Sequence, residues 1–178
     1  FEEDLLDRIL LHLIRDCGRP VHLFDVGCGS ARLHCRYGMK LASDADLAES
    51  GLVQPGVLRA ADSRLRFDPR LEAGVHSVGG LDFSSEMIAL AERKLNALGL
   101  GHLLHEKRLW LRQGSAFDLS PMKKEPLPVA VTLCNSIGVM QGPEGAEELF
   151  RALRRAVEDA GGLALISAYR REAVASHA

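Results

Sequence analysis

Cysteine is scarce and irregularly placed in this sequence, which speaks against two classes of small protein. Cys17, Cys28, Cys35 and Cys134 form no C-x-x-C pair. They therefore match neither a structural zinc site nor the framework of a disulfide-stapled secreted domain. Scattered cysteines of this kind favour reduced thiols in a reducing compartment. We expect a cytoplasmic protein without a metal site.

Long apolar runs and an excess of one charge are also absent. No run approaches the roughly 18 residues of a membrane span. The chain begins with Glu2, Glu3 and Asp4 instead of the basic start of a signal peptide. Lys and Arg number 22 against 24 Asp and Glu, a net charge of −2. Because no large field of one sign favours nucleic acid or an anionic membrane, we expect a small, roughly neutral ligand.

The composition is that of one globular domain. The 178 residues are 47% apolar and 26% charged, which is enough for a sizeable core and typical of a single domain. The chain begins at Phe1 without a methionine and ends at Ala178 soon after an apolar segment. We interpret residues 1–178 as a single domain that is a fragment of a longer protein.

Apolar strands alternate with amphipathic helices along the chain. The strand candidates are apolar on both faces, which predicts a parallel sheet covered by helices on both sides. The fold class is therefore α/β, a three-layer αβα sandwich. The expected strands lie at 21–26, before Asp82, at 109–114, within 128–138 and within 161–169. The expected helices are 2–16 (with Leu5, Leu6, Ile9, Leu10 and Leu13 on its apolar face), 31–36, 84–99 after a Ser84 cap, and 144–159.

Residues 37–78 break this alternation. They are rich in Ala, Gly, Asp and Arg and have only scattered apolar positions. A long irregular stretch is uncommon inside a compact domain. We interpret residues 37–78 as an insertion between the first turn–helix unit and the second strand.

A glycine turn follows the first central strand directly. It reads Asp25-Val26-Gly27-Cys28-Gly29-Ser30-Ala31, and its glycines allow a tight turn and close approach of a ligand to the backbone. The start of the next helix offers free N–H groups to a carboxylate or phosphate. A dinucleotide fingerprint needs a third small residue at position 32, where this chain has Arg32. A second class of nucleotide-type cofactor site requires an acid two residues before the first glycine and a small residue at position 31. This chain has Asp25 and Ala31 at these positions.

At these residues the sequence resembles the class I S-adenosylmethionine-dependent methyltransferases, whose first motif runs D/E-x-G-x-G-x-G. The resemblance implies that Asp25, Gly27, Cys28 and Gly29 bind the methionine part of the cofactor. GLDFSSEMIALAERKL resembles the second motif. It implies that Asp82 binds the ribose hydroxyls and that Phe83 and Met87 contact the adenine.

Two later segments extend the resemblance in the same order. GSAFDL resembles the third motif, which implies that Ala116 and Phe117 line the adenine and that Asp118 accepts from its amino group. LCNSIG lies where the fourth motif ends a strand, so Cys134 and Asn135 would face the methionine part and the methyl acceptor. All these residues follow strand carboxyl ends, where open α/β sheets bind ligands.

The chain departs from the family pattern in two places. Asp82 lies 53 residues after Gly29, whereas the corresponding acid of a Rossmann unit follows after about 20. The family closes its sheet with two further strands after the fifth, and nothing after Tyr169 supplies them. We therefore expect a Rossmann-like, mostly parallel sheet that lacks its last two strands.

The resemblance implies an enzyme that transfers a methyl group from S-adenosyl-L-methionine and releases S-adenosyl-L-homocysteine. An in-line displacement on carbon activated by positive sulfur needs mainly proximity and orientation, and the sequence names no general base. The turn Asn135-Ser136-Ile137-Gly138 is not the [DN]-P-P-[FYW] pattern of relatives that methylate adenine or glutamine amides. We expect a small-molecule acceptor.

Three other functions stay open at this point. One is a cofactor-binding module without activity. Another is an α/β-hydrolase with Ser136, Asp159 and His177 in the chain order of its triad, although Cys134 replaces the small residue that the nucleophile turn requires. The third is a nicotinamide-dependent oxidoreductase, which Arg32 disfavours.

Overall fold

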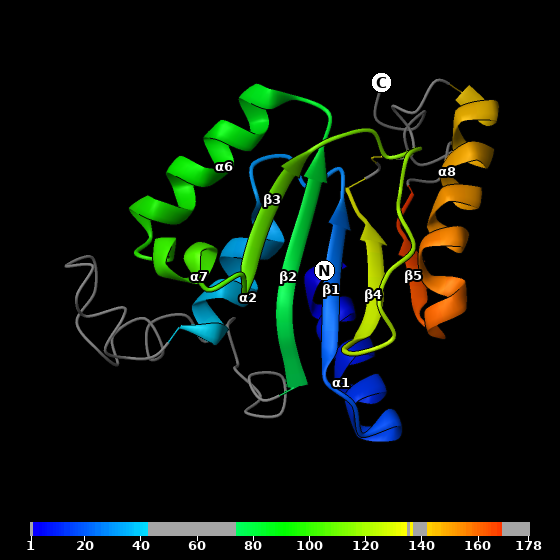
Figure 1. Ribbon diagram of the computed structural model, residues 1–178, viewed down its shortest axis with the longest axis horizontal. Helices are drawn as coiled ribbons and strands as arrows, with labels where there is room; N and C mark the ends of the chain where they lie inside the picture. The colour runs from blue at the N-terminus through cyan, green and yellow to red at the C-terminus, as the bar shows by residue number, and fades with distance from the viewer. Residues whose placement is uncertain (1, 43–73, 135, 137–141, 169–178) are drawn as a thin grey trace, which may run out of the picture.

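Five parallel strands form one sheet in the order β3-β2-β1-β4-β5 (Figure 1). The structure is a computed structural model that describes residues 2–42, 74–134, 136 and 142–168. The strands are β1 (Val21–Val26), β2 (Val75–Asp82), β3 (Leu109–Gln113), β4 (Leu127–Thr132) and β5 (Leu163–Ile166), and every paired neighbour runs parallel.

Helices cover both faces of this sheet. One face carries α1 (Glu2–Cys17), α2 (Arg32–Leu41), α6 (Ser85–Ala97) and α7 (Gly101–His105), and the other carries α8 (Gly142–Val157), which continues into the 3-10 turn η2 (Glu158–Ala160). The predicted α/β class and three-layer Rossmann-like arrangement are confirmed. Among the described helices, none is both long and apolar enough to cross a membrane.

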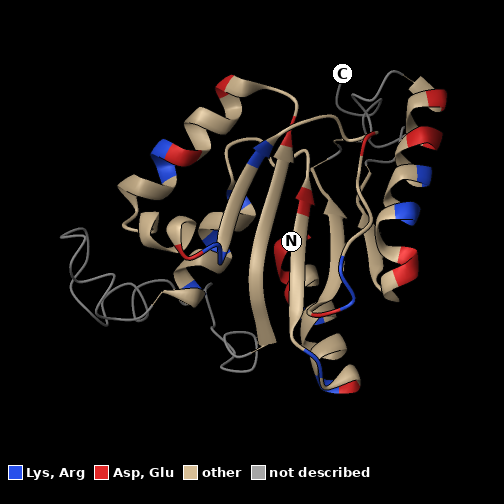
Figure 2. Cartoon of the chain, in the orientation of Figure 1, with Lys and Arg blue, Asp and Glu red and all other residues tan. Residues whose placement is uncertain are grey.

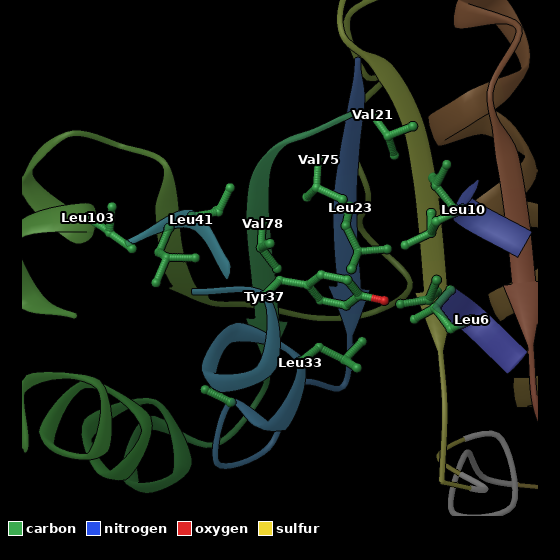
Figure 3. Packing of buried hydrophobic residues seen from close by; sticks show 14 of the residues in the cluster. Leu6, Leu10, Val21, Leu23, Leu33, Tyr37, Leu41, Val75, Val78 and Leu103 are labelled. Carbon is green, nitrogen blue, oxygen red and sulfur yellow. The ribbon is translucent and has the colours of Figure 1, made fainter. Parts of the chain in front are cut away.

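Alternation along β1 divides the core between the two faces. Val21 and Leu23 belong to the cluster that packs against α1 and α2, whereas Phe24 and Val26 belong to the cluster under α8. Figure 3 shows the first cluster, with Tyr37 of α2 lying among residues of α1, β1 and β2. Because β1 is buried on both sides, its sequence contains an almost unbroken apolar run.

Buried charges join α1 to α2. The Asp7 carboxylate accepts hydrogen bonds from Arg36 (2.7 Å), Tyr37 (2.6 Å) and Lys40 (3.2 Å). The Lys40 side chain is only 2% exposed, and its ammonium lies 4.9 Å from the centre of the Tyr37 ring. The helix pair is therefore held by a desolvated ionic network as well as by leucine packing.

Most predicted elements are found within a few residues of their expected ends, but the expected insertion is too long at both ends. Residues 37–41 belong to α2 and residues 75–78 to β2. Polar residues near the end of α2 and the start of β2 made these segments resemble an insertion. In the fold these residues have polar partners, since Lys40 pairs with Asp7 and Ser77 Oγ lies 2.7 Å from His22 Nδ1. Residues 43–73 lie outside the described residues.

The apolar face predicted for α1 is also partly wrong. Leu6 and Leu10 are buried, but Leu5 is 49% exposed. The face that meets the protein also includes Asp7, which accepts hydrogen bonds from Arg36 and Tyr37 of α2. An acidic residue thus belongs to a contact face for which sequence periodicity predicts only apolar residues.

The carboxyl ends of all five strands lie at one edge of the sheet. β1 lies between β2 and β4, so the chain leaves β1 in one direction toward β2 and β3 and later returns to β4 and β5. Open α/β sheets bind ligands at such a reversal of strand order. The segments that follow β1, β2, β3 and β4 therefore frame the candidate site.

Candidate functional site

The glycine turn after β1 is bonded to the end of β2. The backbone N–H groups of Gly27 and Cys28 both donate to the carbonyl oxygen of Leu81, at 2.8 and 3.0 Å. Gly27 has φ +81° and Gly29 has φ +51°, which are backbone conformations that glycine adopts at little cost. The turn predicted from the first motif is thus a fixed part of the sheet edge.

Asp82 brings the first two motifs together. Its Oδ2 accepts from the Gly29 N–H at 2.8 Å, and its Oδ1 accepts from the Ser84 N–H at 3.0 Å. Each carboxylate oxygen keeps further acceptor capacity. The two backbone donors therefore fix the orientation of the carboxylate and leave it able to accept from the hydroxyls of a ligand.

The second motif also starts α6 as predicted. Ser84 Oγ accepts from the Met87 N–H at 3.1 Å, which is a side-chain cap. Met87 lies close to the glycine turn, since a Cβ at Gly29 would be 3.5 Å from Met87 Cε. Phe83 is 81% exposed, so its ring presents a free apolar face beside Asp82.

Asp25 is a buried carboxylate at the end of β1. Burial raises its pKa to about 7; the nearby Arg32 charge opposes this shift, and the Asp82 charge adds to it. Such a group gains from a cation placed against it, since a positive neighbour favours the charged form. Figure 2 shows acidic positions at the carboxyl ends of both β1 and β2. This edge therefore suits a ligand that carries positive charge.

Replacing Asp25 by asparagine is expected to make the protein more stable at pH 8 than the unchanged chain, and nearly equal to it at pH 4. The folded pKa of about 7 exceeds the ordinary value, so the folded state holds a proton that the unfolded state loses between about pH 4 and 7. Asp25 therefore destabilises the fold increasingly as pH rises through this range, by up to a few kcal/mol.

Urea unfolding of both chains at a series of pH values measures this difference. Comparison of the two chains also removes the contribution of the partly buried His22 and the buried His34, whose pKa values are lowered to about 4 mainly by desolvation. A stability difference that stays constant from pH 4 to 8 would contradict the assignment.

The third motif is placed less favourably than the second. Ala116 and Phe117 are half-buried and pack against the cluster under α8. Asp118 is exposed, and its N–H donates to the Ser115 carbonyl at 3.2 Å. The segment does follow β3 at the same sheet edge as Asp82, so its adenine contacts stay a prediction.

The two predicted cysteines occupy different environments. Cys28 is buried on the α2 side, where its Sγ would lie 2.9 Å from a Cβ at Gly80, and burial raises its thiol pKa. Only its backbone belongs to the turn surface. Cys134 is exposed, has φ +56°, and lies at the carboxyl end of β4. A non-glycine residue in this conformation carries local backbone strain of about 1 kcal/mol.

Glu2 and Arg32 are site neighbours that sequence reasoning missed. Glu2 Oε2 accepts from both the N–H and the Sγ of Cys134, each at 3.3 Å. Arg32 begins α2 and lies 2.8 Å from Glu3 and 3.5 Å from Glu2. The acidic first turn of α1 had signalled a helix start, but nothing in the sequence showed that it would meet the end of β4.

The arrangement separates the candidate hydrolase triad. Ser136 follows β4 at the carboxyl edge, where its Oγ donates to the Leu133 carbonyl at 2.7 Å. Asp159 lies in η2 just before β5, at the opposite edge of the sheet. A serine and an acid at opposite ends of parallel strands cannot share a histidine. Asn135 and His177 lie outside the described residues.

Comparison with solved structures finds the same fold in several proteins. The chain is similar to a protein of Methanococcus maripaludis described as an S-adenosyl-L-methionine-dependent methyltransferase (TM-score 0.51, 15% identity, 95% of this chain and 60% of that one). It is also similar to DesVI of Streptomyces venezuelae (0.53, 15%, 92% and 49%) and to the PH0226 protein of Pyrococcus horikoshii OT3 (0.53, 14%, 99% and 58%). No protein-family model and no curated protein sequence matches the chain.

The chain therefore has the Rossmann-like fold of the class I S-adenosylmethionine-dependent methyltransferases. It spans about half to three-fifths of the length of these three structures. At 14 to 15% identity the likeness establishes the fold, so any activity has to be argued from the residues of the site.

Proposed function

We propose that this chain binds S-adenosyl-L-methionine at the carboxyl edge of β1, β2 and β4, and that the cofactor's methyl group is transferred to a small molecule. The observation that carries the proposal is the 2.8 Å hydrogen bond between Gly29 N–H and Asp82 Oδ2. It joins two motifs that are 53 residues apart, in the spatial relation that a cofactor with both an amino-acid part and a ribose requires.

The donor and acceptor groups at this edge match the parts of the cofactor. Asp25 supplies a buried carboxylate for the ammonium group. The first turn of α2 has no side-chain cap and no acidic residue, so its free N–H groups suit the cofactor's carboxylate. Asp82 suits the ribose diol, and Phe83 with Met87 offers apolar surface to the adenine. These matches support the proposal residue by residue.

The bound cofactor would supply a methyl carbon already activated by its positive sulfur. The residues of the chain would then orient it, because Asp82 is held by two backbone donors and the glycine turn is held by Leu81. Such fixed positioning lowers the barrier of an in-line displacement, and this contribution does not require a general base. The end of β4 with Cys134 faces this edge and is the proposed acceptor side.

Isothermal titration calorimetry with S-adenosyl-L-methionine, S-adenosyl-L-homocysteine and NAD tests the proposal. We expect saturable micromolar binding of the first two. Asp82→Asn keeps the side-chain volume and is expected to weaken that binding about 10- to 100-fold, since a hydrogen bond to a charged group contributes roughly 1.5–3 kcal/mol. Asp159→Asn, an exposed aspartate at the opposite sheet edge, is the matched control and should bind like the unchanged chain.

Two results would overturn the proposal. One is binding of NAD without binding of either sulfur compound. The other is unchanged S-adenosyl-L-homocysteine affinity in Asp82→Asn. Thermal unfolding of each variant shows whether a lost affinity reflects the site or the fold.

A further inference from the structure

A second concavity lies on the α8 side of the sheet, away from the carboxyl-edge site. Its volume is about 430 Å³, within the range of small-molecule pockets. In Figure 1, α8 stands over the β4 and β5 side, whereas no described helix crosses in front of β2 and β3. Of the predicted cofactor residues, none of the eleven that the structure describes lines this cavity. A ligand there would occupy a site of its own.

Aromatic rings form the floor of the cavity. The Trp110 ring stacks beside that of Phe24, with centroids 5.3 Å apart and ring planes inclined by 27°, and beside that of His22 at 5.9 Å and 16°. Gly79 permits this arrangement, because a Cβ there would overlap the indole ring. Trp110 is half-buried, so one side of the indole rests on the sheet and part of the ring is open to the cavity.

The rim of the cavity carries two cations that are free to meet a ligand. Arg112 at the end of β3 and Lys123 of the β3–β4 connection both line it and are exposed. Neither forms an ion pair with any of the described residues. Glu125, the acid on the same rim, is paired with Arg19 at 2.8 Å. The net charge that the rim offers to a ligand is therefore positive.

The connection from β3 to β4 supplies an apolar wall. Leu119 is buried, and Met122 packs against the cluster under α8, with its N–H donating to the Ala156 carbonyl at 2.8 Å. This bond ties the wall to the end of α8. The cavity thus combines a flat aromatic floor, an apolar wall and a cationic rim.

We propose that this cavity is a second ligand site, which binds a planar aromatic carboxylate with its ring over Trp110 and its carboxylate toward Arg112 and Lys123. Offset ring stacking adds about 0.5–1.5 kcal/mol beyond simple burial, which favours a flat aromatic ring over an aliphatic one. The rim cations select a carboxylate over its neutral amide, since charge-assisted hydrogen bonds are roughly twice as strong as neutral ones.

The chain provides its own reporter for this site, because Trp110 is its one tryptophan. A nitrogen-15-labelled protein therefore gives a single indole N–H signal. We expect naphthalene-2-carboxylate to shift this signal saturably. Cyclohexanecarboxylate, without the ring system, and naphthalene-2-carboxamide, without the charge, are each expected to bind about tenfold more weakly.

Variants of the rim cations test which side chains recognise the carboxylate. The double variant Arg112→Gln/Lys123→Gln is expected to weaken naphthalene-2-carboxylate at least tenfold and to leave the carboxamide unchanged. Lys124→Gln alters the adjacent lysine, which does not line the cavity, and should behave like the unchanged chain. Asp82→Asn should also retain binding, so failure of the cofactor proposal and failure of this one are separately visible.

Any of three results would overturn the second site. The indole signal could stay unmoved at millimolar naphthalene-2-carboxylate. The acid and its amide could bind equally. The double variant could bind the acid as tightly as Lys124→Gln does.

Discussion

Replacing Asp7 by asparagine is expected to lower the free energy of unfolding by about 3 kcal/mol, because breaking a buried ion pair by removing one partner typically costs roughly 3–5 kcal/mol. Asparagine keeps the side-chain volume, so the loss reports the charge and not a cavity. The Asp7 carboxylate is shared by Arg36, Tyr37 and Lys40, and Lys40 is almost completely buried. The variant leaves that ammonium in the interior without this carboxylate.

The matched control lies on the same helix. Asp16 forms an ion pair with Arg15 at 3.0 Å and lies 3.0 Å from His12, and all three side chains are exposed, so Asp16→Asn should change stability by less than about 1 kcal/mol. Urea unfolding at pH 7 measures both variants. If Asp7→Asn and Asp16→Asn cost the same, the α1–α2 network contributes no more than a surface pair.

At acidic pH the difference in unfolding free energy between Asp7→Asn and the unchanged chain should disappear. Burial acts to raise the pKa of Asp7, but hydrogen bonds from Arg36 and Tyr37 and the charge of Lys40 outweigh it, so the net pKa is lowered. A carboxyl with a lowered folded pKa stabilises the fold above its unfolded pKa, and this contribution is lost as pH falls through the folded value. The two unfolding curves should converge in acid and separate toward pH 7.

The helices and strands could be predicted from the sequence because their patterns are local. VHLFDV is apolar except at His22 and Asp25, and β1 is found at the predicted ends. Ser84 followed by an apolar helical face predicted the start of α6, and Gly99, with φ +72°, follows its last turn. These features depend on backbone conformation and periodicity, which neighbouring residues determine.

The interactions that the sequence did not reveal are those between distant residues of unlike chemistry. The sequence pattern places Lys40 and Tyr37 in a polar insertion, yet both are buried against Asp7, about 30 residues earlier. Glu2 meets Cys134 across 132 residues. Hydrophobic periodicity places charged residues on the solvent side of a helix or strand. It therefore cannot identify a charged residue that is buried together with an oppositely charged partner.

The cofactor residues show the same division. Asp82 could be chosen from its place at a strand end, and the structure brings it to the glycine turn. Cys28 could not be assigned from sequence, because its backbone serves the turn whereas its thiol packs against Gly80 inside the protein. A sequence motif predicts where a residue lies along the chain. The direction of its side chain depends on the neighbouring strand, which for Cys28 is β2 with Gly80.

Adjacent glycines of β2 provide the second large expected effect. Gly80→Ala is expected to destabilise the fold by about 3 kcal/mol, at the upper end of the usual cost of overpacking a core. The new Cβ would lie 2.8 Å from His34 Nε2 and 2.9 Å from Cys28 Sγ. His34 is fully buried and its Nε2–H donates to the Trp110 carbonyl at 3.2 Å, so neither neighbour can move without disturbing the strands or the glycine turn.

Gly79→Ala makes the identical change on the other face and is the matched control. Its Cβ would meet the Trp110 ring, but that ring is only half-buried and lines the cavity, so it can rotate into the cavity at the cost of its stacking, about 1 kcal/mol. Urea unfolding should therefore rank Gly80→Ala as the more destabilising, and a red shift of tryptophan emission should accompany Gly79→Ala. The reverse ranking would show that the α8-side face of β2 is the more tightly packed one.

Gly80→Ala also connects packing to the site. Gly80 pairs with Asp25 across β1 and β2, and a displaced Cys28 would move the turn whose Gly29 N–H contacts Asp82. S-adenosyl-L-homocysteine affinity should therefore fall in Gly80→Ala under conditions where the variant is still folded, and stay unchanged in Gly79→Ala. His34→Ala in the Gly80→Ala background opens the space that the new methyl group needs, so it should recover part of the lost stability. Failure of this rescue would place the clash at Cys28 alone.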